Sequence, residues 1–119
     1  MTRLSQSEVD AHMARMQGYT QAPDTPDKGS ESELQKKCIQ YCKHQGWPVF
    51  HDRSRHVNEP GWPDLTVYLP NGKTVLVELK AKAGKLRKEQ KELKLRLHFL
   101  GHTVHVVKSF KKFVSILEG

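Results

Sequence analysis

Three charged residues near the middle of the chain have the types and spacing needed for phosphodiester hydrolysis. Glu78 and Lys80 are two residues apart in the alternating apolar segment 74–81, and side chains two apart on a strand share one face. Asp64 opens the apolar segment 64–69, and a strong turn signal separates the two segments. We therefore predict a hairpin that brings the three charged side chains together.

Two carboxylates and a lysine in one place suit metal-assisted hydrolysis. Mg²⁺ takes hard oxygen ligands from one or two carboxylates, with waters and substrate phosphates. Such an ion lowers the pKa of bound water and neutralises charge that develops at phosphorus. Asp64 and Glu78 supply the carboxylates, and Lys80 can orient the attacking water and offset transition-state charge. The alternative is a cross-strand salt bridge of Lys80, the commoner origin of a Glu-x-Lys pair taken alone.

The surrounding sequence resembles the PD-(D/E)-x-K nucleases, and more narrowly the virus-type replication-repair nuclease (VRR-NUC) family. The stretches that match this family, in chain order, are Glu31-Ser32-Glu33-Leu34-Gln35 with Cys38, Gly61-Trp62-Pro63-Asp64, Val77-Glu78-Leu79-Lys80, Lys85 to Gln90, Gly101, and Ser109-Phe110. Each stretch alone is common, but their order and spacing together are fairly specific. The likeness runs from about Glu31 to Leu117.

The resemblance implies a restriction-endonuclease-like α/β fold, with a mixed β-sheet flanked by helices in the order α-β-β-β-α-β-α. It also implies Mg²⁺ (or Mn²⁺) as the cofactor, with Asp64 and Glu78 as metal ligands and the Leu79 backbone carbonyl as a further ligand. Lys80 would be the catalytic lysine, and Glu31 would contact the metal directly or through water. The number of metal ions, one or two, stays open.

Four residues on the expected helices have more than one interpretation. Glu33 lies close to Glu31, and the motif register favours Glu31; for either, the alternative is a favourable charge at a helix start. Gln90 falls on the leucine stripe of segment 86–100, where a glutamine needs hydrogen-bond partners. In the family the matching glutamine faces the active site, and the alternative is the rim of the core. Gln35 either bonds to site residues or faces solvent.

Basic residues precede and follow the charged cluster in the sequence. The residues that we expect to contact DNA phosphates are Arg53 and Arg55, in a loop that also holds His56, and Lys82, Lys85, Arg87 and Lys88. Phosphate contacts give salt-dependent affinity without sequence information. For Lys91 and Lys94 we expect a solvated helix face, with ion pairs to nearby glutamates.

The hydrophobic pattern predicts the elements that must position these residues. A helix begins after Ser30, a plausible N-cap, and ends at Gly46. The further elements, in order, are strands at 47–51, 64–69 and 74–81, a helix at 86–100, a strand at 102–108, and a last helix capped by Ser109 with Phe110, Phe113, Val114 and Leu117 as its apolar face. No Ser, Thr or Asp precedes Leu86 to fix the start of its helix.

The chain divides into an extension and one domain. Capping-box spacing predicts a short helix at 5–17, and the turn-rich segment 18–30 is typical of a linker. We therefore assign residues 1–29 to an N-terminal helical or flexible extension and residues 30–119 to the nuclease domain. A chain of 119 residues has the length of a single domain.

Composition narrows the class of protein. The formal net charge of +7 suits a polyanionic partner, and 36% hydrophobic residues allow a modest core, which a second subunit could complete. Cys38 and Cys42 lie one helical turn apart and are expected to be small buried residues rather than a disulfide, and the His and Cys spacing does not fit zinc. The chain has neither a membrane-length apolar run nor a signal-peptide core, so we expect a cytoplasmic protein, in the host cell if viral.

These observations lead to one expected function and two alternatives. We expect a metal-dependent endonuclease without a small-molecule cofactor, and the resemblance implies a viral, homodimeric enzyme that cuts branched DNA such as four-way (Holliday) junctions in DNA repair. The first alternative is flap, nicking or non-specific nuclease activity on the same fold. The second is a non-catalytic DNA-binding module, which the carboxylates of Asp64 and Glu78 argue against, because they would repel phosphate without a cation.

Overall fold

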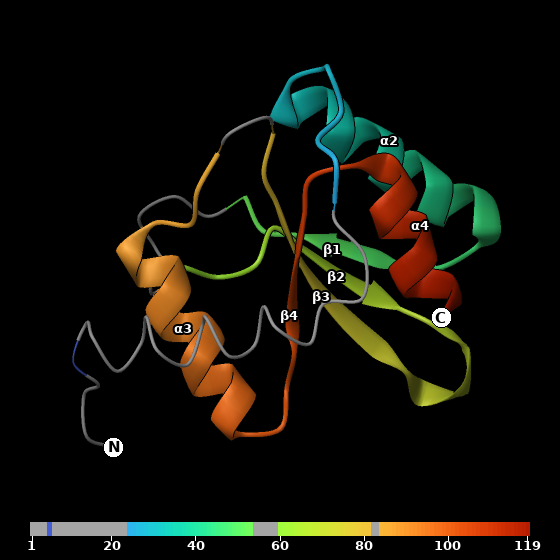
Figure 1. Cartoon of the computed structure of the whole chain (residues 1–119). Helices are drawn as coiled ribbons and strands as arrows, with labels where there is room; N and C mark the ends of the chain where they lie inside the picture. The colour runs from blue at the N-terminus through green and yellow to red at the C-terminus, as the bar shows by residue number, and fades with distance from the viewer. Residues whose placement is uncertain (1–4, 6–23, 54–59, 82–83) are drawn as a thin grey trace.

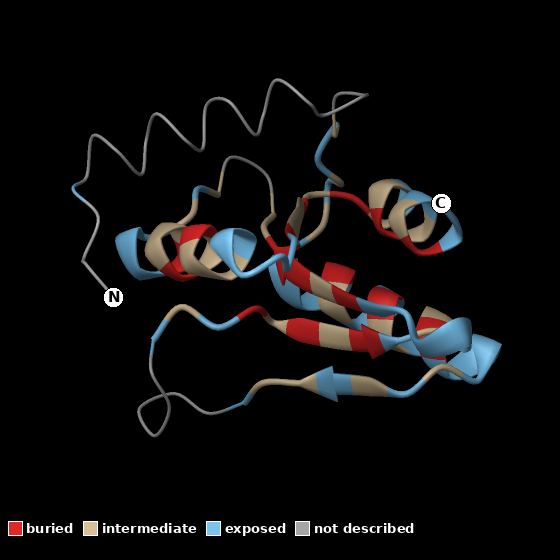
Figure 2. Cartoon of the chain, turned by 90° about the horizontal axis from the view of Figure 1, so that it is seen from below, coloured by how far each residue is buried: buried red, intermediate tan, exposed pale blue. Residues whose placement is uncertain are grey.

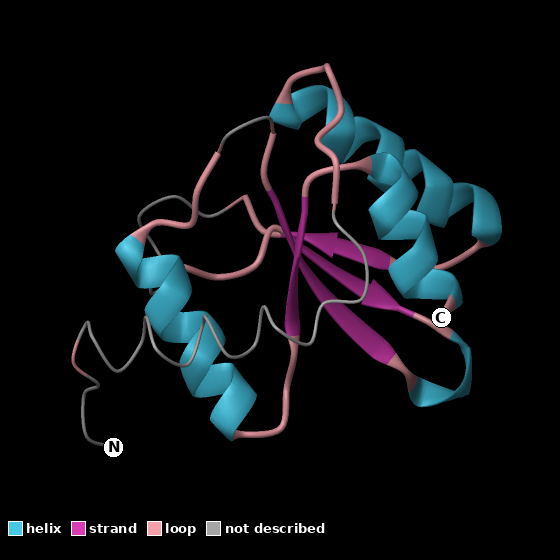
Figure 3. Ribbon diagram, viewed as in Figure 1, coloured by secondary structure: helices cyan, strands magenta, loops and turns pink. Residues whose placement is uncertain are grey.

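The computed structural model describes Ser5 and residues 24–53, 60–81 and 84–119. Its elements are α2 (Glu31–Gln45), β1 (Val49–His51), β2 (Leu65–Tyr68), the short 3₁₀ helix η1 (Pro70–Gly72), β3 (Thr74–Leu79), α3 (Lys88–Phe99), β4 (Val104–Val107) and α4 (Phe110–Glu118). This order confirms the predicted α-β-β-β-α-β-α fold (Figure 3). The helix predicted at 5–17, Arg55, His56 and Lys82 lie outside the described residues.

The strands form one mixed sheet in the order β1-β2-β3-β4. The first three are antiparallel neighbours, whereas β4 runs parallel to β3. A parallel neighbour requires a crossover connection, and α3 lies in that connection. In Figure 1, α2 and α4 lie side by side at one flank, and α3 lies apart from them. Leu65 pairs with Val77, so the residue before β2, Asp64, lies next to Glu78.

The main core lies between the sheet and the helices α2 and α4 (Figure 2). Its buried members are Leu34, Cys38, Cys42, Leu65, Val67, Val75, Val77, Leu79, Val107, Phe113 and Leu117. Both cysteines are fully buried and form no disulfide, which confirms their expected role as small apolar residues. None of the helices in the described part of the chain is long and apolar enough to cross a membrane.

The ends of α2 and α4 are fixed by the residues that the sequence predicted. The Ser30 side chain accepts a hydrogen bond from the Glu33 N–H at 3.1 Å, and Gly46 takes the left-handed conformation (φ 79°) that ends α2. The Ser109 hydroxyl accepts from the Lys112 N–H at 3.1 Å and so caps α4. Local chemistry therefore determines where both helices begin.

Helix α3 differs from its prediction at both ends and on one face. It spans Lys88–Phe99, and Leu100, predicted on the apolar stripe, is 63% exposed because the helix has already ended. Lys94, predicted to be solvated, is half-buried and lies beside Leu93 and Val104. Burial lowers the pKa of Lys94. The solvated-face interpretation was therefore wrong for Lys94.

The segment before α2 is attached to the start of α4. One Asp24 carboxylate oxygen accepts from the Lys108 N–H at 2.5 Å, and the other accepts from the Ser109 hydroxyl at 2.6 Å. Asp27 accepts from the Phe110 N–H at 2.9 Å. The last residues of the predicted linker thus pack on the domain, while the assignment of residues 1–29 as an extension stays a prediction.

Candidate active site

Asp64 and Glu78 lie together where β2 begins and β3 ends. The Leu79 N–H donates to Asp64 Oδ2 at 2.8 Å, so the backbone of β3 fixes the Asp64 carboxylate. Glu78 is 3% exposed, and its side chain hydrogen-bonds to Asp64. The hairpin thus brings the two predicted carboxylates into contact, and of the two only Asp64 is partly exposed to solvent.

The Glu78 carboxyl is strongly perturbed by this position. Burial raises its pKa from 4.5 to about 9, and the hydrogen bond and negative charge of Asp64 act in the same direction. Glu31 raises the pKa further, whereas the positive charge of Lys80 lowers it. At neutral pH the metal-free site therefore keeps a proton on Glu78, because two adjacent carboxylates cannot both ionise cheaply without a nearby cation.

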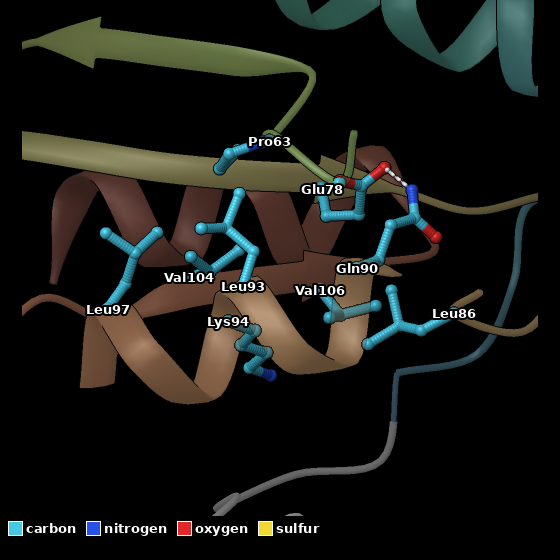
Figure 4. A pocket seen from close by; sticks show the side chains of 10 residues that line it. Pro63, Glu78, Leu86, Gln90, Leu93, Lys94, Leu97, Val104 and Val106 are labelled. Carbon is cyan, nitrogen blue, oxygen red and sulfur yellow. Dashed lines mark hydrogen bonds between the residues drawn. The ribbon is translucent and has the colours of Figure 1, made fainter. Parts of the chain in front are cut away.

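Gln90 connects Glu78 to the start of α3. Its Nε2 donates to Glu78 Oε1 at 2.9 Å (Figure 4). Its own Oε1 accepts from the Arg87 N–H at 2.9 Å. Both ends of the amide are used, so its orientation is fixed, and Gln90 is only 5% exposed. The glutamine also supplies the helix start that the sequence did not explain, since its side chain bonds to the backbone N–H of the N-cap residue.

Apolar side chains surround this pair and account for the burial of Glu78. Those that line the hollow between α3 and the sheet are Pro63, Leu86, Leu93, Leu97, Val104 and Val106 (Figure 4). Gly61 lies there too, with a φ of 99°. A Cβ on Gly61 would be 2.4 Å from the Glu89 carbonyl oxygen, so only glycine lets this loop approach α3.

A second pocket opens on the other side of Asp64. It has a volume of about 160 Å³, and the residues that line it are Glu31, Ser32, Gln35, Asp64 and Leu79. The structure distinguishes the two glutamates that the sequence left open. Glu31 lines the pocket, whereas the Glu33 carboxylate accepts from the Ser30 hydroxyl at 3.3 Å as part of the helix cap. Ser32 was not singled out from the sequence, although it lies beside Glu31.

His51 is a further residue that the sequence reasoning missed. It ends β1 opposite Leu65, and the next residue, Asp52, donates its N–H to the Asp64 carbonyl at 3.0 Å. The His51 ring contacts the Gln35 side-chain amide through Nε2 and accepts from Arg53 Nε at Nδ1, at 3.3 Å. The predicted strand 47–51 could have revealed it, because its end must pair near Asp64.

The basic residues have different surroundings. Lys80 follows β3, is half-buried, and donates its N–H to the Val107 carbonyl at 2.9 Å. The positive charge of Lys80 acts on Glu78 and lowers the pKa of that carboxyl. The described residues predicted to contact DNA are all exposed: Arg53, Lys85, Arg87 and Lys88. Arg55 and Lys82 lie outside the described residues.

The donor set fits a hard divalent cation rather than a soft one. Asp64 and Glu31 offer carboxylate oxygens to the pocket of about 160 Å³, and the buried Glu78 contacts Asp64 from the neighbouring strand. In the described part of the chain, no group of three or more His, Cys, Asp or Glu side chains forms a ready-made metal cluster. Waters and substrate phosphates would complete the coordination of such an ion.

Comparison with known proteins places the chain among nucleases. No family model matches the sequence, and no curated protein matches it significantly. A solved structure described as "VRR_NUC domain" superposes with a TM-score of 0.61 and 29% identity, over 76% of this chain and 97% of that one. A second, "VRR_NUC domain protein", shares the fold with a TM-score of 0.64 and 20% identity, over 77% and 88%. The likeness to these two structures supports the assignment of the chain to the VRR-NUC family of nucleases.

Proposed function

We propose that this protein is a divalent-metal-dependent endonuclease that hydrolyses phosphodiester bonds in DNA. The observation that carries the proposal is the contact between the buried Glu78, whose pKa is raised to about 9, and Asp64, which lines an open pocket. A protein that only bound DNA would have no use for two carboxylates at that place. They would repel the phosphates and, at neutral pH, hold a proton instead of a cation.

Each residue of the site has a role in this proposal. Asp64, Glu78 and the Leu79 carbonyl would hold Mg²⁺ or Mn²⁺, and Glu31 would act directly or through water. The cation supplies a more acidic water and neutralises charge on the phosphate. Lys80 offsets charge that develops at the phosphate and orients the attacking water. Its half-buried position strengthens its electrostatic effect, because fewer waters screen it.

Gln90 has a positioning role in the same site. Its amide donates to one Glu78 oxygen at 2.9 Å and leaves the other oxygen available to a cation. Because the Arg87 N–H holds the other end of the amide, the Glu78 carboxylate cannot rotate without breaking the start of α3. The ionised carboxylate therefore keeps one orientation.

We further propose that the substrate is branched DNA, such as a four-way junction, and that the enzyme is a homodimer. The net charge of +7 supports a polyanionic substrate, and the exposed Arg53, Lys85, Arg87 and Lys88 would contact its phosphates. The resemblance to stand-alone family members supports the branched substrate. Two-fold symmetry suits that task, since two sites would face paired strands.

Cleavage assays test this proposal. A labelled four-way junction, a flap and a matching linear duplex are incubated with the full chain and Mg²⁺, Mn²⁺ or EDTA. Asp64→Ala and Lys80→Ala are compared with Lys111→Ala, an exposed lysine on α4, as the matched control. Light scattering after size-exclusion chromatography gives the number of subunits in solution.

The outcomes separate the candidate functions. Metal-dependent symmetric cuts in the junction alone, lost in Asp64→Ala and Lys80→Ala but kept in Lys111→Ala, support a junction-cutting dimer. Cuts in the flap or duplex support another nuclease activity on this fold. A chain that binds junctions but cuts none of the three substrates with either metal is a DNA-binding module, and the enzyme proposal then fails.

A further inference from the structure

The Gln35 side chain lies between the pocket and a pair of residues outside it. Gln35 lines the pocket that Glu31 and Asp64 also line, and its amide contacts His51 Nε2. On the far side of the His51 ring, Arg53 Nε donates to Nδ1 at 3.3 Å. The three side chains thus form a continuous hydrogen-bonded chain from the surface to the pocket wall, although they come from α2, β1 and the loop after β1.

The chemistry of these groups determines which way the Gln35 amide faces. The Arg53 guanidinium only donates, so Nδ1 of a neutral His51 ring must accept. The ring proton is then on Nε2, which donates toward Gln35. The structure places the Gln35 Nε2 atom against His51 Nε2, and two donors cannot bond to each other. The oxygen and nitrogen of an amide are alike in shape, so hydrogen-bond chemistry assigns them, and we turn the amide over so that the Gln35 oxygen accepts from His51.

This orientation leaves the Gln35 NH₂ group for the pocket. Glu31 and Asp64, which line the same pocket, offer only acceptors when ionised. A substrate phosphate that enters beside them needs donors as well as the cation. A neutral amide donates to a phosphate oxygen without competing with the cation for the carboxylates.

We propose that Gln35 is a substrate residue of the site, which donates to the scissile phosphate, and that His51, held by Arg53, is a positioning residue that fixes its amide. This inference rests on the proposed nuclease function. Among the described residues that line the pocket, only Gln35 and the Ser32 hydroxyl offer neutral side-chain donors. His51 and Gln35 are 16 residues apart in the sequence and meet only through the fold.

The His51 tautomer tests the relay without any nuclease assay. Long-range ¹H–¹⁵N NMR correlation at pH 8 distinguishes an Nε2 proton from an Nδ1 proton, and the spectrum of His51→Phe identifies the His51 signals among the seven histidines. We expect the proton on Nε2, with Arg53→Ala shifting the ring toward a mixture of tautomers. A proton on Nδ1 in the wild-type protein would overturn the relay, whether or not the chain cuts DNA.

Single-turnover cleavage with saturating enzyme tests the role of Gln35. Loss of one hydrogen bond to a charged group predicts that Gln35→Leu slows cleavage by about 10- to 100-fold, with DNA affinity in Ca²⁺ nearly unchanged. His51→Phe should slow it less, and His51→Gln, which keeps a donor, should recover part of the rate. Gln40→Leu, an exposed position on the same helix, is the matched control, and thermal unfolding checks the fold of each variant.

The double variant decides whether His51 acts through Gln35. If it does, His51→Phe adds no further loss to Gln35→Leu. Losses that multiply in the double variant, or a Gln35→Leu variant as fast as Gln40→Leu, overturn the proposal. If the wild type cuts no DNA, the proposed function fails, and the proposed contact of Gln35 with the scissile phosphate fails as well. The His51 tautomer still tests, independently of cleavage, whether Arg53 and His51 fix the Gln35 amide.

Discussion

Replacing Glu78 with glutamine is expected to stabilise the metal-free protein at neutral and alkaline pH. Burial and the neighbouring Asp64 raise the pKa of Glu78 from 4.5 to about 9. Between these pH values the native state keeps a proton that the unfolded chain has released, so the native state binds more protons. Stability from this group is therefore complete below about pH 4.5 and falls as pH rises toward 9.

The size of the effect follows from the two pKa values. A pH of 7 lies about 2.5 units above the pKa of the carboxyl in the unfolded chain. At about 1.4 kcal/mol per unit, the free energy of unfolding is therefore about 3 kcal/mol lower at pH 7 than at acid pH. That is a large share of the unfolding free energy of about 5–15 kcal/mol that is typical of a domain. A glutamine is neutral at every pH, can accept from Gln90 and can donate to Asp64, so it keeps both contacts of the protonated carboxyl.

Urea unfolding in EDTA at pH 5.5, 7 and 8.5 measures this difference. Over that range the free energy of unfolding of the wild type should fall by about 4 kcal/mol relative to Glu78→Gln. Glu89→Gln, at an exposed glutamate on α3, is the matched control and should follow the wild type. Added Mg²⁺ at pH 8.5 should restore stability to the wild type, because an ion bound only by the native state stabilises it, and should do little for Glu78→Gln.

Parallel pH curves for the wild type and Glu78→Gln would refute the reasoning. They would mean that Glu78 ionises in the native state as it does in the unfolded chain. The pair of carboxylates would then be solvated and not buried, and its proposed need for a cation would lose its physical basis. A failure of Mg²⁺ to stabilise the wild type would contradict only the metal proposal, because the measurement in EDTA does not involve an ion.

Three further predictions concern the buried thiols, the hydrogen bonds from Lys108 and Ser109 to Asp24, and the close approach of Gly61 to α3. Burial raises the pKa of Cys38 to about 12 and of Cys42 to about 11, so Ellman's reagent at pH 8 should react with neither thiol in the folded protein and with both in urea; fast reaction of the native protein would contradict this. Asp24→Ala removes the acceptors for Lys108 and Ser109 and should lower the free energy of urea unfolding by about 1–3 kcal/mol. No change would show that these two hydrogen bonds contribute nothing to stability. Gly61→Ala forces a Cβ against the Glu89 carbonyl and should cost about 1–3 kcal/mol in the same assay; a neutral result would mean that the loop rearranges freely.

The sequence predicted the parts of the fold that depend on local chemistry. The caps of α2 and α4, the turn at η1 and the hydrophobic alternation of β2 and β3 all involve neighbours along the chain. Because the hairpin register follows from the short turn, the approach of Asp64 to Glu78 could be predicted as well. The fold and its central pair of carboxylates were therefore accessible without a structure.

Contacts between distant segments were not accessible in the same way. Asp24 accepts a hydrogen bond from Lys108, 84 residues further along the chain, and no local sequence pattern indicates such a contact. The interpretation of Lys94 was wrong because periodicity shows which side chains are apolar but not how far a partner covers a lysine. The sequence analysis treated His51 only as one of the histidines whose spacing does not fit zinc, since its contact with Gln35 requires β1 to pair beside Asp64.

Gln90 shows why the least regular part of the sequence belongs to the site. A Ser or Asp at the N-cap of α3 would accept from N–H groups of the first turn, but not from the N–H of the N-cap residue itself, which here is Arg87. Because Gln90 itself accepts from that N–H, the same side chain starts the helix and holds Glu78. The missing cap signal was therefore informative, since local rules are expected to fail where a residue has a second function. A residue with both roles links the stability of α3 to the orientation of the buried carboxylate, so a change at Gln90 should alter both together.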